Sequence, residues 1–430
     1  MRLLYTIVWI FALPLVLARL FWRGRKEPGY RQHIAERFGF YPSPKIGQPV
    51  IWIHAVSVGE TRAAEPLIRQ LILAYPQHRI LLSHMTPTGR ATGATLFQDE
   101  IGNRLIQQCF LPYDIPLFIN RLLTHFDPTI CILMETEVWP NLIHTCRQQQ
   151  VPVALVNARL SPRSLRKAER LSGLIRPASV ALSCVAAQTE ADARRIMQLG
   201  ATNVVVTGNS KFDVSIPPEK IAAGHALRQQ WGNRPVLLCA STREGEEELI
   251  LDAYRQSGNA GIADLLLVIV PRHPQRFDLV EQFIQQHGLT SVRRTQLAQS
   301  GLPADVQVVL GDTMGELASY YVSCDIAFIG GSLLPLGGQN LIEACAVEKP
   351  VLIGPHTFNF EAISTDAIAA KAALRVDDAN AIFLETATLI NNPALRTSMG
   401  QCALGFADQH RGATAHTMAL LRELISAAKY

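Results

Sequence analysis

The feature that most limits the fold of this 430-residue chain is a regular alternation of short apolar runs with longer amphipathic segments. The runs have strand length and carry many β-branched residues, whereas segments such as 63–73 and 187–199 repeat apolar residues at helical spacing. Strands that alternate with helices form βαβ units, so the pattern predicts a parallel sheet covered by helices on both faces. In the first half, the predicted strands cover residues 50–53, 80–83, 129–134, 153–156 and 204–207.

The same alternation starts again after a polar segment, residues 209–220, that contains Pro217 and Pro218. Because 430 residues exceed what one hydrophobic core usually covers, this restart predicts a second α/β domain. Its predicted strands cover residues 235–240, 265–270, 306–310, 326–329 and 351–353.

We therefore expect two doubly wound domains that face a cleft, with ligands bound outside the carboxyl ends of the strands. The last helical pattern covers residues 414–428 and could pack back onto the first domain. The expected boundaries are an N-terminal segment 1–26, a first domain 27–210, a linker 211–220 and a second domain 221–430.

An N-terminal segment of nearly continuous apolar residues, 3–18, precedes this pattern and contains no charged residue. Four basic residues follow it, at positions 19, 23, 25 and 26. The length approaches that of a membrane span, and the basic flank predicts that the rest of the chain lies in the cytoplasm. We predict an uncleaved membrane anchor over residues 1–26, with a cleaved signal peptide as the alternative. Whether residues 3–22 span the bilayer or lie in its surface is left open.

Composition and missing motifs exclude several classes of protein. The formal net charge of +4 is too weakly basic to indicate a nucleic-acid partner. The eight cysteines show neither C-x-x-C spacing nor a zinc pattern, so we expect reduced, buried thiols. The chain has no G-x-x-x-x-G-K-[ST], and no G-x-G-x-x-G after the first strand, which disfavours P-loop NTPases and NAD enzymes. Without a D-x-D or a His/carboxylate cluster, we expect no cofactor and no catalytic metal.

The first predicted strand is followed by H-A-V-S-V-G-E-T, residues 54–61, ahead of a predicted helix. Glu60 would lie at the carboxyl end of the strand, where it could act as a general base toward an attacking hydroxyl. It could also be an ordinary first-turn carboxylate that complements the helix dipole, and spacing alone favours this second interpretation.

Two carboxylates, Glu135 and Glu137, follow the buried run 129–134. Carboxylates at such a position are costly unless they are hydrogen-bonded or used, so a catalytic pair and a solvated loop both stay open. Arg159 and Arg163 begin a series of basic residues at helical spacing, which is either a solvated helix face or a phosphate-binding face near a membrane.

Several strand ends in the second half carry residues that suit an anionic nucleotide. Capping hydroxyls and an arginine follow one strand, a rigid cationic turn follows the next, and glycine-rich turns follow two others. Each turn alone is ordinary loop chemistry, but four of them at the strand ends of one domain indicate a nucleotide. The residues concerned are Ser241, Thr242, Arg243, Pro271, Arg272, His273, Met314, Gly315, Glu316, Gly331, Ser332, Asn340 and Glu343.

Taken together, these segments resemble the Kdo transferases, the family that builds the inner core of lipopolysaccharide in Gram-negative bacteria. The resemblance covers nearly the whole chain and implies a GT-B glycosyltransferase fold with two Rossmann-like domains and a membrane-anchor helix. It is carried by residues 54–61, 134–141 (M-E-T-E-V-W-P-N), 207–212 (T-G-N-S-K-F), 240–246 (A-S-T-R-E-G-E), 271–273 and 330–343.

The resemblance also implies roles for individual residues. Glu60 matches the family's proposed base, and either Glu135 or Glu137 matches a second essential carboxylate. The second domain would bind CMP through the residues named above, and the first would bind the acceptor. The acceptor phosphates are assigned to Arg159, Arg163 and Lys211.

The implied reaction is an inverting transfer of Kdo from CMP-Kdo to a lipid A precursor, at the cytoplasmic face of the inner membrane and without a metal. One alternative is a related GT-B enzyme that uses a UDP-sugar, or a sugar-nucleotide epimerase. Another is a non-catalytic, membrane-bound nucleotide-binding protein. Oligomeric state and the number of Kdo residues added cannot be read from these motifs.

Overall fold

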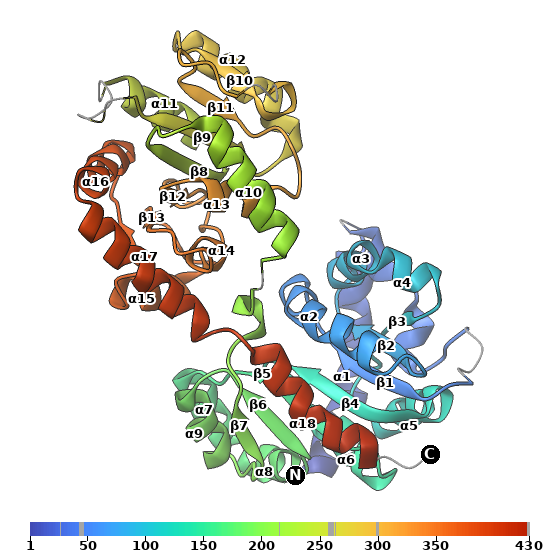
Figure 1. The fold of residues 1–430 in the computed structure, drawn as a ribbon. Coiled ribbons are helices and arrows are strands. Elements are labelled where there is room, and N and C mark those ends of the chain that lie inside the picture. The colour runs from blue at the N-terminus through green and yellow to red at the C-terminus, as the bar shows by residue number, and fades with distance from the viewer. Residues whose placement is uncertain are drawn as a thin grey trace. The chain divides into compact units, whose positions relative to one another are not determined.

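The computed structural model of the chain describes residues 1–25, 27–42, 47–214, 216–256, 262, 264–297 and 301–427. It divides into two compact units, shown in Figure 1. Unit 1 comprises Met1–Asp213 and Gly412–Tyr430, and unit 2 comprises Val214–Arg411. The boundary after Asp213 lies inside the predicted linker, and the chain returns to unit 1 at Gly412, so the last helix belongs to unit 1, as the prediction allowed.

Unit 1 is built on a parallel sheet whose seven described strands have the order β3-β2-β1-β4-β5-β6-β7. The strands are β1 Val50–His54, β2 Arg79–His84, β3 Ile106–Phe110, β4 Pro128–Met134, β5 Val153–Ala158, β6 Cys184–Ala187 and β7 Val204–Val206. The helices are α1 Arg2–Arg23, α2 Val58–Ala74, α3 Pro87–Leu96, α4 Gln98–Gly102, α5 Pro116–Phe126, α6 Pro140–Gln148, α7 Pro162–Arg170, α8 Ser172–Val180, α9 Glu190–Gln198 and α18 Ala413–Ala427. Short 3-10 turns are η1 Pro28–Arg31, η2 Ile34–Phe38 and η3 Ser210–Phe212.

Unit 2 repeats this plan with the strand order β10-β11-β9-β8-β12-β13-β14 among its described residues. The strands are β8 Val236–Thr242, β9 Leu266–Pro271, β10 Ser291–Arg293, β11 Val308–Leu310, β12 Ile326–Ile329, β13 Val351–Ile353 and β14 Ala373–Arg375. The helices are α10 Pro218–Trp231, α11 Glu246–Gln256, α12 Phe277–Gln286, α13 Leu317–Ser323, α14 Ile342–Cys345, α15 Glu361–Ala369, α16 Ala379–Asn391 and α17 Pro393–Asp408. The predicted pair of doubly wound α/β units is confirmed.

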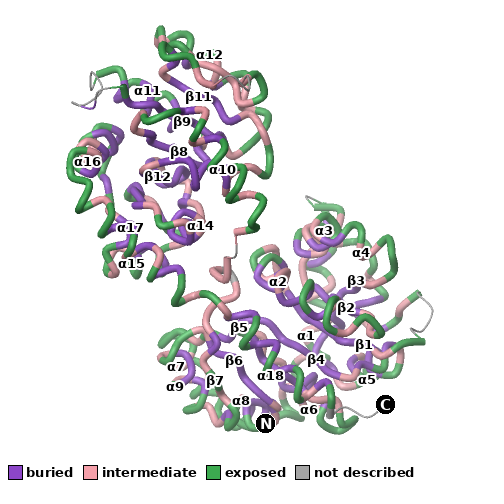
Figure 2. The backbone as a smooth tube through the Cα atoms, in the orientation of Figure 1, coloured by how far each residue is buried: buried purple, intermediate pink, exposed green. Residues whose placement is uncertain are grey.

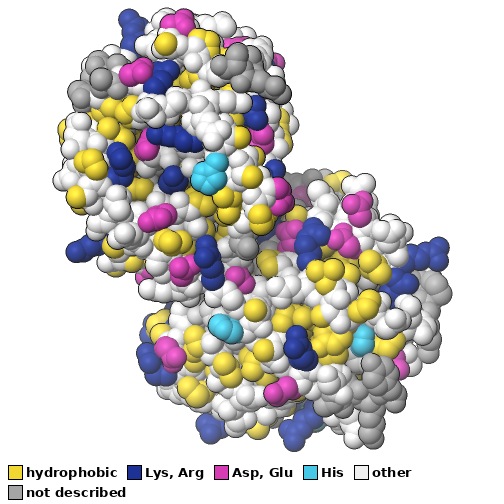
Figure 3. Space-filling model, in the orientation of Figure 1, with side chains coloured by type: hydrophobic (Ala, Val, Ile, Leu, Met, Phe, Trp, Pro, Cys, Tyr) yellow, Lys and Arg dark blue, Asp and Glu magenta, His cyan; other side chains and the backbone are white. Residues whose placement is uncertain are grey.

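Each sheet is buried on both faces, as expected for parallel strands. Along β1, Val50 and Trp52 pack into one apolar cluster, while Ile51 and Ile53 pack into another, so successive residues serve opposite faces. Figure 2 shows the central strands buried and the outer helix surfaces exposed, whereas the edge strands β7 and β10 are only partly buried. On the face shown in Figure 3, Lys and Arg side chains are spread singly among other side chains.

All ten predicted strands are present, and four were missed: β3, β6, β10 and β14. The prediction of one helix over 187–199 was wrong at its start, because β6 ends at Ala187 and α9 begins at Glu190. The last predicted helix corresponds to α18, which packs against α2, β4 and β6 of unit 1. Residues 26 and 428, which bounded the predicted anchor and last helix, lie outside the described residues.

Candidate functional site

The strand order reverses once in each sheet, between β1 and β4 in unit 1 and between β8 and β12 in unit 2. In open parallel sheets, ligands bind at these reversal points, outside the carboxyl ends of the strands. Glu60 lies in the first turn of α2, after β1, and Glu135 follows β4 directly. The fold therefore places the predicted catalytic segments at the reversal point of sheet 1.

Glu60 is held at the start of α2 by its own loop. Its carboxylate accepts the Val56 backbone N–H at 2.9 Å and the Ser57 hydroxyl at 3.1 Å. Ser57 is the N-cap residue of α2, but its hydroxyl donates to Glu60 and makes no capping bond to the helix. The two interpretations of Glu60 are compatible, because a first-turn carboxylate complements the helix dipole while these contacts fix it at the strand end.

The structure separates Glu135 from Glu137. Glu135 is only 4% exposed, has a left-handed backbone (φ 55°), and pairs with Arg159 through a 2.8 Å Oε2–Nε contact. Glu137 instead accepts the indole N–H of Trp139 at 2.7 Å. The pKa of Glu137 is raised to about 7, first by burial and then by the negative charge of Glu60; the hydrogen bond from Trp139 opposes this rise, and the charge of Glu135 adds a smaller contribution to it. Glu137 and Glu60 therefore interact as a carboxylate pair, whereas Glu135 is neutralised by an arginine.

The three residues assigned to acceptor phosphates are not equivalent. Arg159 precedes α7, so it does not belong to the helical face that the spacing predicted, and it is turned toward Glu135. Arg163 is exposed on the first turn of α7. Lys211 belongs by its backbone to η3, and its side chain lies outside the described part of the structure.

Sequence reasoning missed Asn157, the penultimate residue of β5. Asn157 is 3% exposed with a left-handed backbone (φ 51°), and its Oδ1 accepts the backbone N–H of Ser210 at 3.1 Å. Such backbone strain in a non-glycine residue persists where the surrounding structure enforces it, commonly at functional sites. A polar residue directly after an apolar strand was the signal that could have identified it.

In unit 2, the reversal point is organised by Glu246, the first residue of α11, which sequence reasoning also missed. Glu246 is fully buried and accepts three backbone N–H groups: Arg243 at 2.9 Å, Gly331 at 2.6 Å and Leu333 at 2.9 Å. It therefore ties the turn after β8 to the glycine turn after β12. The N–H of Gly331, one of the residues predicted at the nucleotide site, therefore helps to hold this turn.

A second buried carboxylate, Glu247, secures the same turn from the other side. It accepts the Thr242 hydroxyl at 3.0 Å and pairs with Arg276 at 2.9 Å. Arg272 donates its backbone N–H to the Thr242 carbonyl at 2.9 Å, and its charge lowers the pKa of Glu343, which burial raises. Arg272 and Glu343 therefore interact electrostatically at the predicted nucleotide site.

The remaining predicted nucleotide residues divide into surface and interior positions. Ser332 is fully buried, and its hydroxyl donates to the Ile329 carbonyl and accepts the Gly354 N–H, so it shapes the turn and is not exposed for direct contact with a ligand. Asn340 caps its own turn by accepting the Ile342 N–H at 3.2 Å. Ser241, whose φ is 56°, and Pro271 are buried. Glu316 pairs with Arg294. His273, Met314 and Gly315 are exposed.

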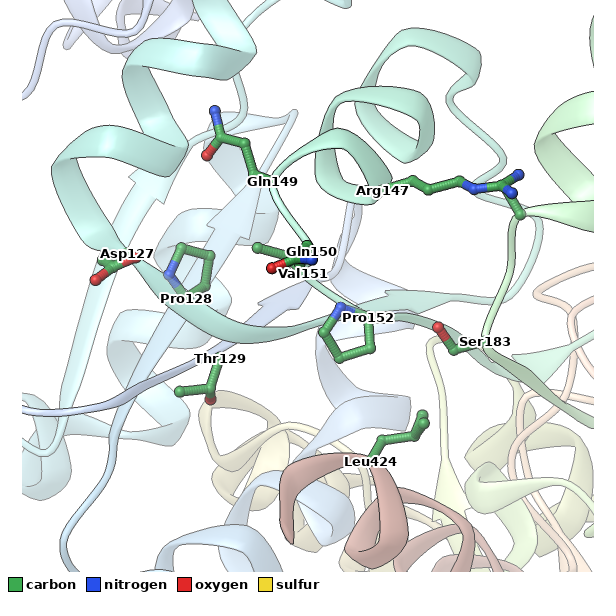
Figure 4. Close-up of a pocket in the computed structure, with 11 residues that line it drawn as sticks. Asp127, Pro128, Thr129, Arg147, Gln149, Gln150, Val151, Pro152, Ser183 and Leu424 are labelled. Atoms are coloured by element: carbon green, nitrogen blue, oxygen red, sulfur yellow. The ribbon is translucent and has the colours of Figure 1, made fainter. Parts of the chain in front are cut away.

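A pocket of ≈ 590 Å³ lies elsewhere in unit 1 (Figure 4). Asp127, Pro128 and Thr129 line it at the start of β4, and Ser183 lines it just before β6. These are the amino ends of the strands, whereas Glu60, Glu135 and Glu137 follow the carboxyl ends. The pocket in Figure 4 is therefore separate from the candidate site.

Exchanging Glu60 for glutamine is expected to lower the pKa of Glu137 below its present value of about 7, because the exchange removes the repulsion between two carboxylates. The burial that contributes most to the raised pKa remains, so the value should stay above that of a free glutamate. Trp139 donates to Glu137, so a pH titration of its fluorescence, with Trp139→Phe protein as the blank, reports this ionisation. The control is Glu65→Gln protein. If the midpoint of the fluorescence titration were the same in Glu60→Gln protein as in this control, the electrostatic coupling between Glu60 and Glu137 would be contradicted.

Comparison with known proteins gives consistent results. A sequence model of the family described as 3-Deoxy-D-manno-octulosonic-acid transferase (kdotransferase) matches residues 32–214. A 3-deoxy-D-manno-octulosonic acid transferase of Bordetella pertussis is 44% identical over 98% of this chain and 99% of its own length. That of Haemophilus influenzae is 37% identical over 98% of both chains. The solved UDP-GlcNAc 2-epimerase from Neisseria meningitidis, 18% identical, has the same fold with a TM-score of 0.54 over 87% of this chain and 100% of that one.

Proposed function

Because the chain belongs to the 3-deoxy-D-manno-octulosonic acid transferase family, we propose that it transfers Kdo from CMP-Kdo to a lipid A precursor in lipopolysaccharide core biosynthesis. The observation that carries the proposal is the carboxylate pair of Glu60 and Glu137 at the strand reversal of sheet 1. Such a pair, in which the pKa of Glu137 lies near neutral pH, suits proton transfer from a hydroxyl nucleophile.

In the proposed reaction, the Glu60 carboxylate takes the proton of an acceptor hydroxyl. The hydroxyl oxygen forms a bond to the anomeric carbon of Kdo, and the bond from that carbon to the CMP phosphate oxygen breaks with its electron pair on CMP. The displacement is single, so the anomeric configuration inverts. Of the two carboxylates left open by the sequence, Glu137 is the one we assign beside Glu60, because Glu135 is neutralised by Arg159.

The negative charge that develops on CMP is assigned to the arginines of unit 2. Arg243 pairs with Glu244, an exposed residue, at 3.0 Å. Exposed ion pairs contribute little to stability and exchange partners readily. Arg272 lies near Glu343, a first-turn carboxylate of α14 that we assign to the ribose hydroxyls. The buried carboxylates Glu246 and Glu247 then serve to hold these turns in shape.

The proposal is tested with detergent-purified protein, CMP-Kdo generated in situ and a tetra-acylated lipid A precursor, followed by mass spectrometry of the lipid. A mass gain of one or more Kdo units is expected. No gain, in the presence of an active control transferase, would contradict the proposal. Parallel reactions with UDP-sugars distinguish the alternative donor, since a gain of a different sugar mass would assign the chain to another reaction.

We also propose that catalysis requires no metal ion. The site carboxylates accept hydrogen bonds from protein groups: Glu60 from a backbone N–H, Glu135 from Arg159 and Glu137 from Trp139. Chelation with EDTA is therefore expected to leave the turnover rate unchanged, within about twofold. CMP-Kdo must be supplied by a separate, pre-quenched reaction, so that the chelator acts on this enzyme alone. A loss of activity that Mg²⁺ or Mn²⁺ restores would contradict this part of the proposal.

A further inference from the structure

One face of helix α1, its inner stripe, is partly buried along the length of the helix. At 1.5 Å per residue its 22 residues extend for about 33 Å. The residues that are partly or fully buried recur every three or four positions, which is the spacing of one helix face. They are Tyr5, Thr6, Trp9, Ala12, Leu13, Val16, Leu17 and Leu20.

The amino-terminal half of α1 is fixed by polar contacts. The Tyr5 hydroxyl donates to Asp114 Oδ2 at 3.0 Å, and Thr6 Oγ1 accepts from Asn141 Nδ2 at 2.9 Å. Asp114 is 1% exposed and also accepts the backbone N–H groups of Asn141 and Leu142, at 3.1 and 2.7 Å. One buried carboxylate therefore joins α1 to the start of α6.

The carboxyl-terminal end of α1 is fixed to the same unit. Leu20 is 7% exposed, and the Arg31 guanidinium donates to the Phe21 carbonyl at 2.9 and 3.2 Å. A helix that spans a bilayer is surrounded by lipid over about 30 Å. Because the Tyr5 and Thr6 side chains near one end and the Phe21 carbonyl near the other contact unit 1, the helix cannot leave it to cross a membrane without breaking these contacts.

The opposite face of α1 is equally apolar but exposed. Leu3, Phe11 and Leu15 are 75%, 79% and 74% exposed, and Trp22 is 65% exposed. A row of large exposed apolar side chains of this length marks an interaction surface. Exposed arginines flank it at both ends: Arg2, Arg19, Arg23 and Arg25.

We propose that α1 is an in-plane membrane helix, docked on unit 1 by its inner stripe, with its outer face inserted at the headgroup–acyl boundary of an anionic bilayer. The arginines would bind lipid phosphates, and the aromatic and aliphatic side chains would contact the acyl chains of the lipids. Asn141, which contacts α1 through Thr6, is four residues from Glu137 in the sequence. The proposal rests on the proposed function only for the identity of the membrane and for the lipid nature of the acceptor.

The two orientations of α1 place its amino end on different sides of the membrane. A protease-cleavable tag before Met1 and a second tag after Tyr430 are compared in spheroplasts and in inside-out vesicles. The in-plane helix predicts that both tags are cleaved only in inside-out vesicles. Cleavage of the first tag only in spheroplasts would show a spanning helix and overturn the proposal. Because this readout does not use catalysis, that outcome would leave the proposed Kdo transfer untouched, and a failed transfer assay would leave the in-plane helix untouched.

The occupant of the outer face is tested with phosphatidylglycerol-containing vesicles. Phe11→Glu and Leu15→Glu proteins are each expected to bind at least tenfold more weakly than the unchanged chain, whereas Leu73→Glu, at a leucine 81% exposed on α2, should bind normally. Equal binding by all four proteins would overturn the proposal. A second outcome would also overturn the proposal. If the unchanged chain were a dimer without detergent and did not bind vesicles, and if Leu15→Glu converted it to a monomer, a second copy of the chain would cover this face.

Discussion

Glu60→Gln protein is expected to turn over about 10²–10⁴-fold more slowly than the unchanged enzyme, since general-base catalysis contributes a factor of this size. Glutamine keeps an oxygen that can accept the Val56 N–H or the Ser57 hydroxyl, so the start of α2 should stay folded. The loss should appear in kcat, whereas the binding of CMP should be unchanged, because the nucleotide is assigned to unit 2. Initial rates with saturating acceptor, together with calorimetric titration of CMP, measure the two quantities.

The matched control lies on the same helix. Glu65 pairs with Arg69 one turn further along α2, in a surface ion pair that contributes little to stability. Glu65→Gln protein should therefore keep its activity within about twofold. A Glu60→Gln enzyme that retains more than a tenth of the activity would remove Glu60 from the role of base and leave Glu137 as the candidate.

Replacing Glu246 with glutamine is expected to destabilise unit 2 by about 2–4 kcal/mol and to weaken CMP binding. A glutamine amide has one accepting oxygen in place of two, so at least one of the three N–H groups of Arg243, Gly331 and Leu333 would stay buried without a partner. Hydrogen bonds to charged groups are worth about 1.5–3 kcal/mol each, and an orphaned buried donor adds its desolvation cost. Denaturant titration and CMP calorimetry on the purified chain check both effects.

Glu248 provides the control for this experiment. It is exposed two residues further along α11, so Glu248→Gln should change the free energy of unfolding by less than about 0.5 kcal/mol. If Glu246→Gln protein were as stable as Glu248→Gln protein, the three N–H groups would have other partners, and the carboxylate would not organise the turn.

Much of the fold could be predicted from the sequence because buried parallel strands are apolar on both faces and stand out from their surroundings. The four missed strands show the limit of this signal. β3 contains Gln107 and Gln108, and β10, β14 and β6 are three or four residues long. These segments are strands because they pair with a neighbouring strand of the sheet, and a local sequence pattern contains no information on that pairing.

The candidate site shows a similar division. Glu60 and Glu137 could be located because they follow strands that the pattern identified. The interaction that raises the pKa of Glu137 could not, because it arises between segments far apart in the chain. Glu246 stands in a run of three glutamates, which reads as an exposed helix start; only the folded turn shows that Glu246 and Glu247 point inward and Glu248 does not.

The return of the chain to unit 1 at Gly412 has a consequence for how the protein is made. Met418, Leu421 and Ile425 of α18 belong to an apolar cluster that also contains Ile51 and Ile53 of β1. During synthesis, unit 1 emerges first from the ribosome but lacks this part of its core until residues 413–427 have followed all of unit 2. Unit 2 can therefore complete its fold before unit 1, reversing the usual amino-to-carboxyl order and leaving a long interval in which chaperones can bind the uncovered face of sheet 1.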